Sequence, residues 1–182
     1  MLNYARAYRL SDETLGIVDD MLMSETPSAE LEHNGQNGRR VPFDISGQEQ
    51  SICEAVFRWQ FGHLAPERQQ RAQVYFLQIG GRYTLSESSE AFANRFADVN
   101  RPVRPVSASN SGMGDYAFDK KTAERGLIFR VTHFLWRADS ELDVKGGVYE
   151  TASSASSVTY SLKKENGVWK VTSEKTNWIS KD

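Results

Sequence analysis

Apolar and polar residues alternate through most of the last third of the chain, and a period of two is typical of half-buried strands. Residues 126–179 therefore predict four consecutive antiparallel strands. The residues expected to face the core are Leu142, Val144 and Val148 in the second strand, Val158, Tyr160 and Leu162 in the third, and Trp169 and Val171 in the fourth. Asn166-Gly167 predicts a tight hairpin turn between the last two strands.

The first of these strands, residues 127–137, is apolar on both faces. Strict alternation places Leu127, Phe129, Val131 and Leu135 on one face and Ile128, Phe134 and Trp136 on the other. A strand of this kind lies in the middle of a sheet and is covered on both sides. In the next strand, residues 141–150, Gly146-Gly147 predicts a bulge or a sharp bend, and the small residues at 151–157 predict a flexible connection.

Upstream, apolar residues at helical spacing predict a core helix that begins at Ser46 and ends near Gly62 or Leu64. Ser46-Gly-Gln-Glu49 has the form of a capping box at its start. Residues 73–79 predict a strand stopped by Gly80-Gly81. Thr84-Leu-Ser-Glu87 is a second capping-box candidate, for a helix reaching about Val99. Pro102 and Pro105 predict an extended edge strand, and residues 107–122 predict a loop.

The chain divides into an N-terminal extension, residues 1–45, and an α+β domain, residues 46–182. Residues 11–24 predict a short helix with Ser11 as its N-cap. Residues 25–45 then predict a linker, because prolines and Asn-Gly turn dipeptides interrupt any regular element.

The order of these elements resembles the cone-shaped nuclear-transport-factor-like superfold, and the cystatin-like arrangement is its close relative. The resemblance covers roughly residues 47–180 and implies helices packed on the concave face of a strongly bent antiparallel sheet, often with a pocket between them. Gly146-Gly-Val-Tyr-Glu150 and the ending Tyr160–Ser180 look similar to segments of uncharacterised bacterial proteins. Such folds include dehydratases, isomerases, binding proteins and interaction modules, and they often form dimers through a sheet face. We therefore expect a homodimer.

Composition narrows the classes of function. Hydrophobic residues make up 39% and charged residues 25% of the 182 positions, as in an ordinary globular protein. The formal net charge of −2 argues against nucleic-acid binding driven by the phosphate backbone. The closest basic clusters, Arg68 with Arg71 and Arg101 with Arg104, are interpreted as solvated arginines beside turns. No window reaches the apolar length of a membrane span.

Cysteine and leader signals say little about the compartment. Cys53 is the single cysteine, so neither an intrachain disulfide nor a cysteine-only zinc site can form. The first ten residues lack the apolar core of a signal peptide, which favours the cytoplasm, although a trimmed leader would be invisible. The three histidines are not spaced as a metal motif, and we expect neither a metal nor a cofactor.

His133 is the strongest single candidate for chemistry. Because it alternates with Val131 and Leu135, its imidazole is expected to point into an apolar interior, where it could serve as a general base. The alternative is a neutral core histidine with one hydrogen bond. Tyr149 and Glu150 follow the glycine pair and could supply an oxyanion donor and a base. Their alternative is an aromatic packing residue beside a solvated carboxylate.

Two functions follow from these residues. The first is a pocket for a small apolar ligand, with His133, Tyr149, Glu150, Trp59 and Phe129 as candidate lining residues. In its catalytic form it would be an isomerase or dehydratase that uses His133 with Tyr149 or Glu150. The second is a non-enzymatic interaction module that binds a protein partner or a second copy. No catalytic motif is visible, so we favour the non-enzymatic interpretation.

Overall fold

A mixed sheet of nine strands organises the part of the chain that the computed structural model describes, residues 47–80, 86–110 and 116–180. These residues belong to one unit, Arg40–Asp182. The main order is β2-β1-β6-β7-β8-β9. The strands are β1 (Val74–Ile79), β2 (Ser86–Glu87), β3 (Val103–Pro105), β4 (Ser109–Asn110), β5 (Ala117–Asp119), β6 (Arg125–Ala138), β7 (Glu141–Thr151), β8 (Ser154–Glu165) and β9 (Val168–Ile179). The expected N-terminal helix and linker lie outside the described residues.

The four long strands, β6 to β9, form the expected antiparallel meander, and the α+β class is confirmed. The expectation of a purely antiparallel sheet is wrong at one edge. There β1 pairs parallel with both β3 and β6. The short strands β4 and β5 come from the segment that was expected to be a loop, and β5 joins the start of β6.

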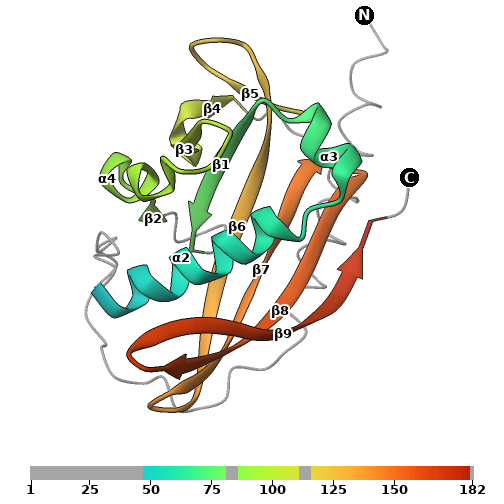
Figure 1. Cartoon of the computed structure of the whole chain (residues 1–182). Helices are drawn as coiled ribbons and strands as arrows, with labels where there is room; N and C mark the ends of the chain where they lie inside the picture. The colour runs from blue at the N-terminus through green and yellow to red at the C-terminus, as the bar shows by residue number, and fades with distance from the viewer. Residues whose placement is uncertain (1–46, 81–85, 111–115, 181–182) are drawn as a thin grey trace, which may run out of the picture. The chain divides into compact units, whose positions relative to one another are not determined.

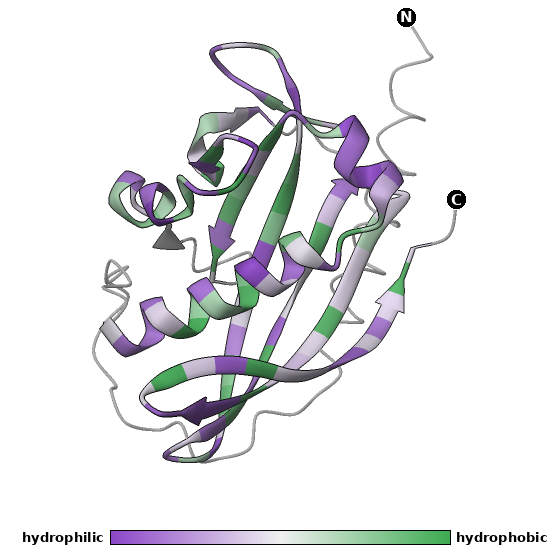
Figure 2. Ribbon diagram, viewed as in Figure 1, coloured by the Kyte–Doolittle hydropathy of each residue, from purple (hydrophilic) through white to green (hydrophobic). Residues whose placement is uncertain are grey.

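Helix α2 (Gly47–Gly62) lies across one face of the sheet, which we call the inner face (Figure 1). It runs close to the predicted bounds and buries Ile52, Cys53, Val56, Phe57, Gln60 and Phe61. Its solvent side is polar, whereas the hydrophobic positions of β1 and β6 gather beside it (Figure 2). This amphipathic pattern is what fixes the helix on the sheet.

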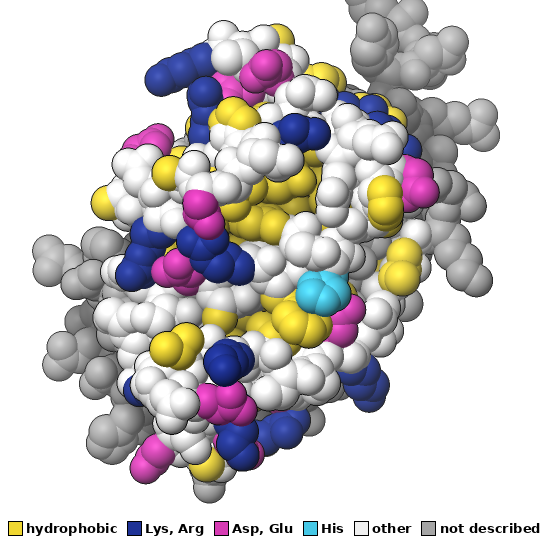
Figure 3. Space-filling model, viewed as in Figure 1, with side chains coloured by type: hydrophobic (Ala, Val, Ile, Leu, Met, Phe, Trp, Pro, Cys, Tyr) yellow, Lys and Arg dark blue, Asp and Glu magenta, His cyan; other side chains and the backbone are white. Residues whose placement is uncertain are grey.

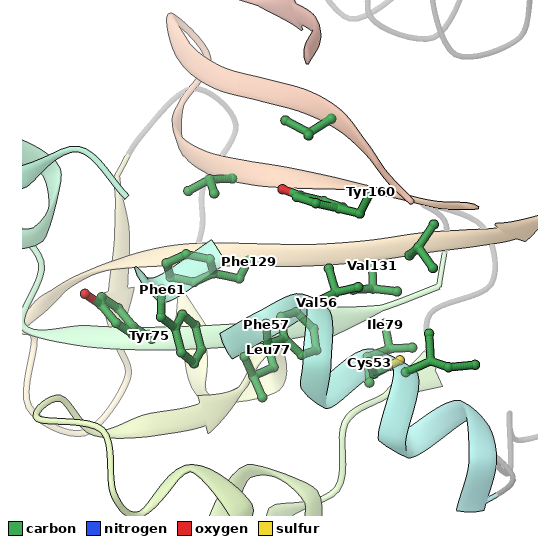
Figure 4. Close-up of a cluster of buried hydrophobic side chains, with 14 of the residues drawn as sticks. Cys53, Val56, Phe57, Phe61, Tyr75, Leu77, Ile79, Phe129, Val131 and Tyr160 are labelled. Carbon is green, nitrogen blue, oxygen red and sulfur yellow. The ribbon is translucent and has the colours of Figure 1, made fainter. Parts of the chain in front are cut away.

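Aromatic side chains fill the space between α2 and the sheet (Figure 4). The Phe61 ring lies 4.8 Å from Phe129 and 5.0 Å from Tyr75, measured between ring centroids. A smaller cluster on the outer face contains Val74, Phe76, Ala117 and Ile128. Strand β6 is therefore covered on both faces over its first half, as its sequence predicts.

A β-bulge at Thr132 changes the faces of β6. Val131 pairs with Gly146, but His133 pairs with Lys145, so Thr132 is an extra residue. One extra residue reverses the alternation of side chains beyond it. Phe134 and Trp136 therefore lie on the inner face, and His133 and Leu135 lie on the outer face. The expected assignment of these four residues is wrong.

The glycine pair in β7 allows close packing of the neighbouring backbones, and the predicted bulge is not at this pair. The β6–β7 register remains continuous through Gly146 and Gly147, and the nearby irregularity lies on β6. A Cβ atom on Gly147 would lie 1.9 Å from the Ser156 carbonyl oxygen, and one on Gly146 would lie 2.3 Å from that of Arg130. Neighbouring backbones therefore occupy the space that a side chain would need.

Three connections differ from the prediction. Helix α3 (Pro66–Arg71) was not expected; it follows α2 and has Pro66 in its first turn, a favoured position for proline. Helix α4 (Glu90–Ala93) is capped by Ser89, whose Oγ accepts from the Phe92 amide at 3.1 Å, and the 3₁₀ turn η1 (Asn94–Phe96) follows it directly. The run 151–157 is mostly strand, because β8 begins at Ser154.

Candidate functional site

Glu150 lies where four elements meet at one end of the inner face. It is the next-to-last residue of strand β7, before the connection to β8, and α3 lies at this end of the sheet (Figure 1). Glu150 is only 1% exposed, so the interpretation of it as a solvated carboxylate is wrong, and Glu150 is a buried charge. We call Glu150, Arg68, Arg71, Arg125 and Ser154 the Glu150 cluster.

Both carboxylate oxygens of Glu150 accept hydrogen bonds from side chains. Oε2 accepts from Ser154 Oγ at 2.9 Å, from Arg71 Nη2 at 3.2 Å and from Arg68 Nε at 3.3 Å. Oε1 accepts from Arg125 Nη2 at 2.5 Å. A buried carboxylate is stable only with such partners, and charge-assisted hydrogen bonds are the strongest available.

Two of the arginines are themselves oriented by further contacts. Arg68 Nη2 donates to Ser154 O at 3.0 Å and to Ser154 Oγ at 2.9 Å. The Arg125 guanidinium lies 3.4 Å from the centroid of the Tyr116 ring. The cluster therefore ties α3 and the start of β6 to the β7–β8 connection.

Burial opposes ionisation of Glu150, but the hydrogen bonds from Ser154, Arg125 and Arg68 and the charge of Arg71 outweigh it, so its pKa is lowered. A carboxylate held ionised in this way is a poor general base, because proton abstraction needs a pKa closer to neutrality. The cluster holds a buried negative charge. It does not poise Glu150 for proton transfer.

The side chains of His133 and Tyr149 lie on the outer face of the sheet, whereas that of Glu150 lies on the inner face. The imidazole of His133 is exposed on the outer face, and partial burial together with the charge of Lys145 lowers its pKa. Tyr149 is half-buried on the outer face, where the Arg130 guanidinium lies 5.0 Å from its ring centroid. The expectation of an inward His133 is wrong, and the structure brings neither residue to Glu150.

The two remaining candidates also have separate environments. Phe129 is fully buried beneath α2 and packs against Phe61 and Tyr75. Trp59 is half-buried, and its Nε1 donates to Glu174 Oε2 of β9 at 2.6 Å. His63 stacks on the Trp59 ring with centroids 3.9 Å apart. These contacts pin α2 to β9, and the five candidate residues do not converge on one cavity.

Two buried polar groups lack the properties of a nucleophile or base. Burial raises the pKa of the Cys53 thiol, which therefore stays protonated. Burial also raises the pKa of Tyr160 to about 12, despite a hydrogen bond from Gln60 Nε2 at 3.1 Å. Within the described ranges, no group of three His, Cys, Asp or Glu side chains is placed to hold a metal ion.

A surface pocket lies beside α4 and η1. One pocket of about 360 Å³ is lined by η1 and the approach to β3, including Phe96, Val99, Arg101 and Val103. Figure 3 shows hydrophobic side chains at the bottom of a hollow on the α2 side, between charged groups. None of the five candidate residues lines the pocket beside η1.

The opposite end of β6 exposes large apolar side chains. Three of the six exposed large hydrophobic residues in the described part lie there, namely Leu135, Trp136 and Val168, at 50%, 47% and 59% exposure. Trp136 packs edge-on against the buried Trp169, with ring centroids 5.7 Å apart. We call Leu135, Trp136, Val168 and Trp169 the Trp136 patch. It spans both sides of this end of the sheet, because Leu135 lies on the outer face and Trp136 and Trp169 lie on the inner face.

Sequence reasoning missed the arginines of the Glu150 cluster. Arg68 and Arg71 were interpreted as solvated, yet Arg68 is only 19% exposed and both contact the buried carboxylate. Arg104, from the second basic pair, likewise contacts the buried Asp119, at 2.8 Å. The available signal was Pro66, which starts α3 and places Arg68 and Arg71 on a helix.

Comparison with known proteins gives no relative for this chain: no family model, no curated protein and no solved structure matches it. No described helix has the length and apolar character needed to cross a membrane. The function must therefore be argued from the two ends of the sheet.

Proposed function

We propose that this chain is a non-enzymatic interaction module that associates with a second copy of itself through the Trp136 patch. The observation that carries the proposal is the exposure of Leu135, Trp136 and Val168 at one end of the sheet, with Leu135 on the outer face and Trp136 on the inner face, so a second copy would pack around this end. Tryptophan is enriched among the residues that dominate binding energy at protein interfaces, and clustered exposed apolar residues mark such interfaces.

The charges around the patch favour a second copy over a charged partner. Arg137 pairs with Asp143, Lys163 with Glu141 at 2.9 Å, and Lys170 with Glu165 at 3.0 Å. These three positive side chains each have a negative neighbour, and Lys164 lies 5.7 Å from the centroid of the Trp169 ring, so charges of both signs are mixed around the patch. A two-fold interface requires a surface complementary to itself, and a balanced ring around an apolar centre meets that requirement.

The edges of the sheet are less suited to association. The outer edge strand β9 carries irregularities at Thr172 and Asn177 and charged residues along its length, both of which discourage pairing with another strand. At the opposite edge of the described sheet, the short strands β2 and β3 border β1 on the side away from β6. Pairing through side chains at the Trp136 patch therefore fits better than a continuous sheet across two copies.

The catalytic alternative gains no support from the geometry. Tyr149 and Glu150 are adjacent in β7 and point to opposite faces, and His133 is exposed on the face that holds Tyr149. The resemblance to nuclear-transport-factor-like and cystatin-like folds, with a cone-shaped sheet, stays a prediction. The position of α2 across one sheet face supports it.

The test is the mass of the particle in solution, measured by light scattering during size-exclusion chromatography. The unmodified chain should form a dimer, and Trp136→Ala should shift it to a monomer. Trp178→Ala is the matched control, because Trp178 is half-buried at the far end of β9 and should remain dimeric.

A second variant protects the test from misfolding. Val168→Asp places a charge on a side chain that is 59% exposed, so it should leave the fold intact and still abolish the dimer. The proposal would be excluded if the unmodified chain stays monomeric at high concentration, or if both patch variants stay dimeric.

A further inference from the structure

The Glu150 cluster holds more positive charge than its carboxylate neutralises. Three guanidinium groups, from Arg68, Arg71 and Arg125, contact the single carboxylate of Glu150. Three positive charges against one negative charge leave an excess of two. Guanidinium groups held this close repel one another, and partial burial strengthens that repulsion because it reduces screening by water. A second anion would relieve it.

Two of the three guanidinium groups still offer donors to solvent. An arginine side chain carries five N–H groups, yet among the described residues Arg71 and Arg125 each donate a single hydrogen bond, to Glu150. Their side chains are 51% and 28% exposed. Arg68 is different, because it donates three hydrogen bonds and is 19% exposed.

The protein also fixes the orientation of these open donors. Glu150 is 1% exposed and bridges Arg71 and Arg125 through its two oxygens, which keeps the two guanidinium groups near each other. Tyr116 supports Arg125 from its ring face at 3.4 Å. A site with pre-oriented donors binds more strongly than flexible surface arginines, because less side-chain entropy is lost.

We infer that the solvent side of Arg71 and Arg125 binds a phosphate group. A phosphate group carries a charge of about −1.5 to −2 near pH 7, which matches the excess of two positive charges. A carboxylate would balance only half of that excess. Arginine forks also suit phosphate oxygens in geometry. The phosphate can come from inorganic phosphate or from a phosphate monoester.

The experiment is calorimetric titration of the full chain with inorganic phosphate at constant ionic strength. The unmodified protein should bind phosphate saturably. Arg71→Ala should raise the dissociation constant about ten- to a hundredfold, the equivalent of one charge-assisted hydrogen bond. Arg71→Lys, which keeps the charge and loses the fork, should fall between the two. Arg95→Ala is the matched control, because Arg95 is 40% exposed and pairs with Glu54 far from the cluster in sequence.

Three results would overturn the inference: no saturable binding by the unmodified chain, equal binding by Arg71→Ala, or equal loss in Arg95→Ala. A parallel titration with phenyl phosphate separates the two sources of phosphate. If phenyl phosphate binds, the site accepts phosphate monoesters. If inorganic phosphate binds and phenyl phosphate does not, the site is specific for inorganic phosphate. Trp136→Ala should bind phosphate like the unmodified chain, so the failure of the dimer proposal and of this inference are distinguishable.

Discussion

The two ends of β6 use the same chemical groups for different purposes. At the Arg125 end, a buried carboxylate gathers three arginines and joins α3 to the sheet. At the Trp136 end, pairs such as Lys163 with Glu141 are about half exposed and surround apolar side chains. A contact between a basic side chain and a carboxylate therefore does not by itself indicate how much the pair stabilises the fold. Burial decides whether the pair supports the fold or only keeps a surface soluble.

The largest expected effect comes from removing the buried charge. Glu150→Gln leaves three arginines without their carboxylate and should lower the free energy of unfolding by about 2–4 kcal/mol. Removing one partner of a fully buried pair costs about 3–5 kcal/mol, and the value here is lower because Arg71 and Arg125 reach solvent. Urea unfolding at pH 7 measures it.

A loss below about 1 kcal/mol, the range of an exposed pair, would contradict the structural role assigned to Glu150. Glu165→Gln is the control, because Glu165 pairs with Lys170 and its side chain is 48% exposed. That variant should unfold like the unmodified chain.

Acid should erase the difference between the unmodified chain and Glu150→Gln. The folded pKa of Glu150 is lowered, so its contribution is present above the unfolded value, about 4.3, and is lost as the pH falls through the folded pKa. The free energies of unfolding of the two proteins should converge below pH 4. A gap that stays constant from pH 7 to pH 3 would show that the carboxylate charge is not the cause.

Much of the fold is predictable from the chain because local signals agree with it. The alternation in β7 and β8, the Asn166-Gly167 turn and the broad apolar face of α2 all correspond to observed elements. The helix expected from residue 84 begins only at Glu90 and is much shorter, because Ser86–Glu87 forms β2 and Ser89 is the N-cap, while Thr84 lies outside the described residues.

The candidate site was less predictable because it depends on contacts between distant residues. The face of His133 is reversed by a single extra residue, and no local pattern distinguishes Thr132 from an ordinary strand residue. Glu150 looks solvated in a strand that ends in small residues. Its partners lie 79 and 82 positions away for Arg71 and Arg68, beyond the reach of periodicity.

The bulge itself can be removed to sharpen the comparison between the ends. Deletion of Thr132 restores simple alternation and keeps His133 on the outer face and Trp136 on the inner face. It should therefore lower the free energy of unfolding by only about 0.5–1.5 kcal/mol, the value of the lost Thr132 hydrogen bond to Lys145 O. Thermal unfolding followed by near-ultraviolet circular dichroism reports both stability and the tryptophan environment.

Insertion of one alanine between Phe134 and Leu135 is the opposite change. It moves Trp136 to the outer face and separates it from Trp169, so it should cost more and alter the tryptophan signal. If the deletion is the more damaging of the two, the bulge does not set the faces as described.

The smallest expected effect lies at the Trp136 end. Asp143 accepts from Arg137 and, at 2.8 Å, from Ser161 Oγ, while the Arg137 side chain is 58% exposed. Asp143→Asn keeps the shape and an acceptor for Ser161, so the free energy of unfolding should change by about 0–1 kcal/mol. Urea unfolding beside Glu150→Gln compares the two ends directly. Equal losses in both variants would mean that burial does not separate them, and the contrast drawn between the two ends of β6 would fail with it.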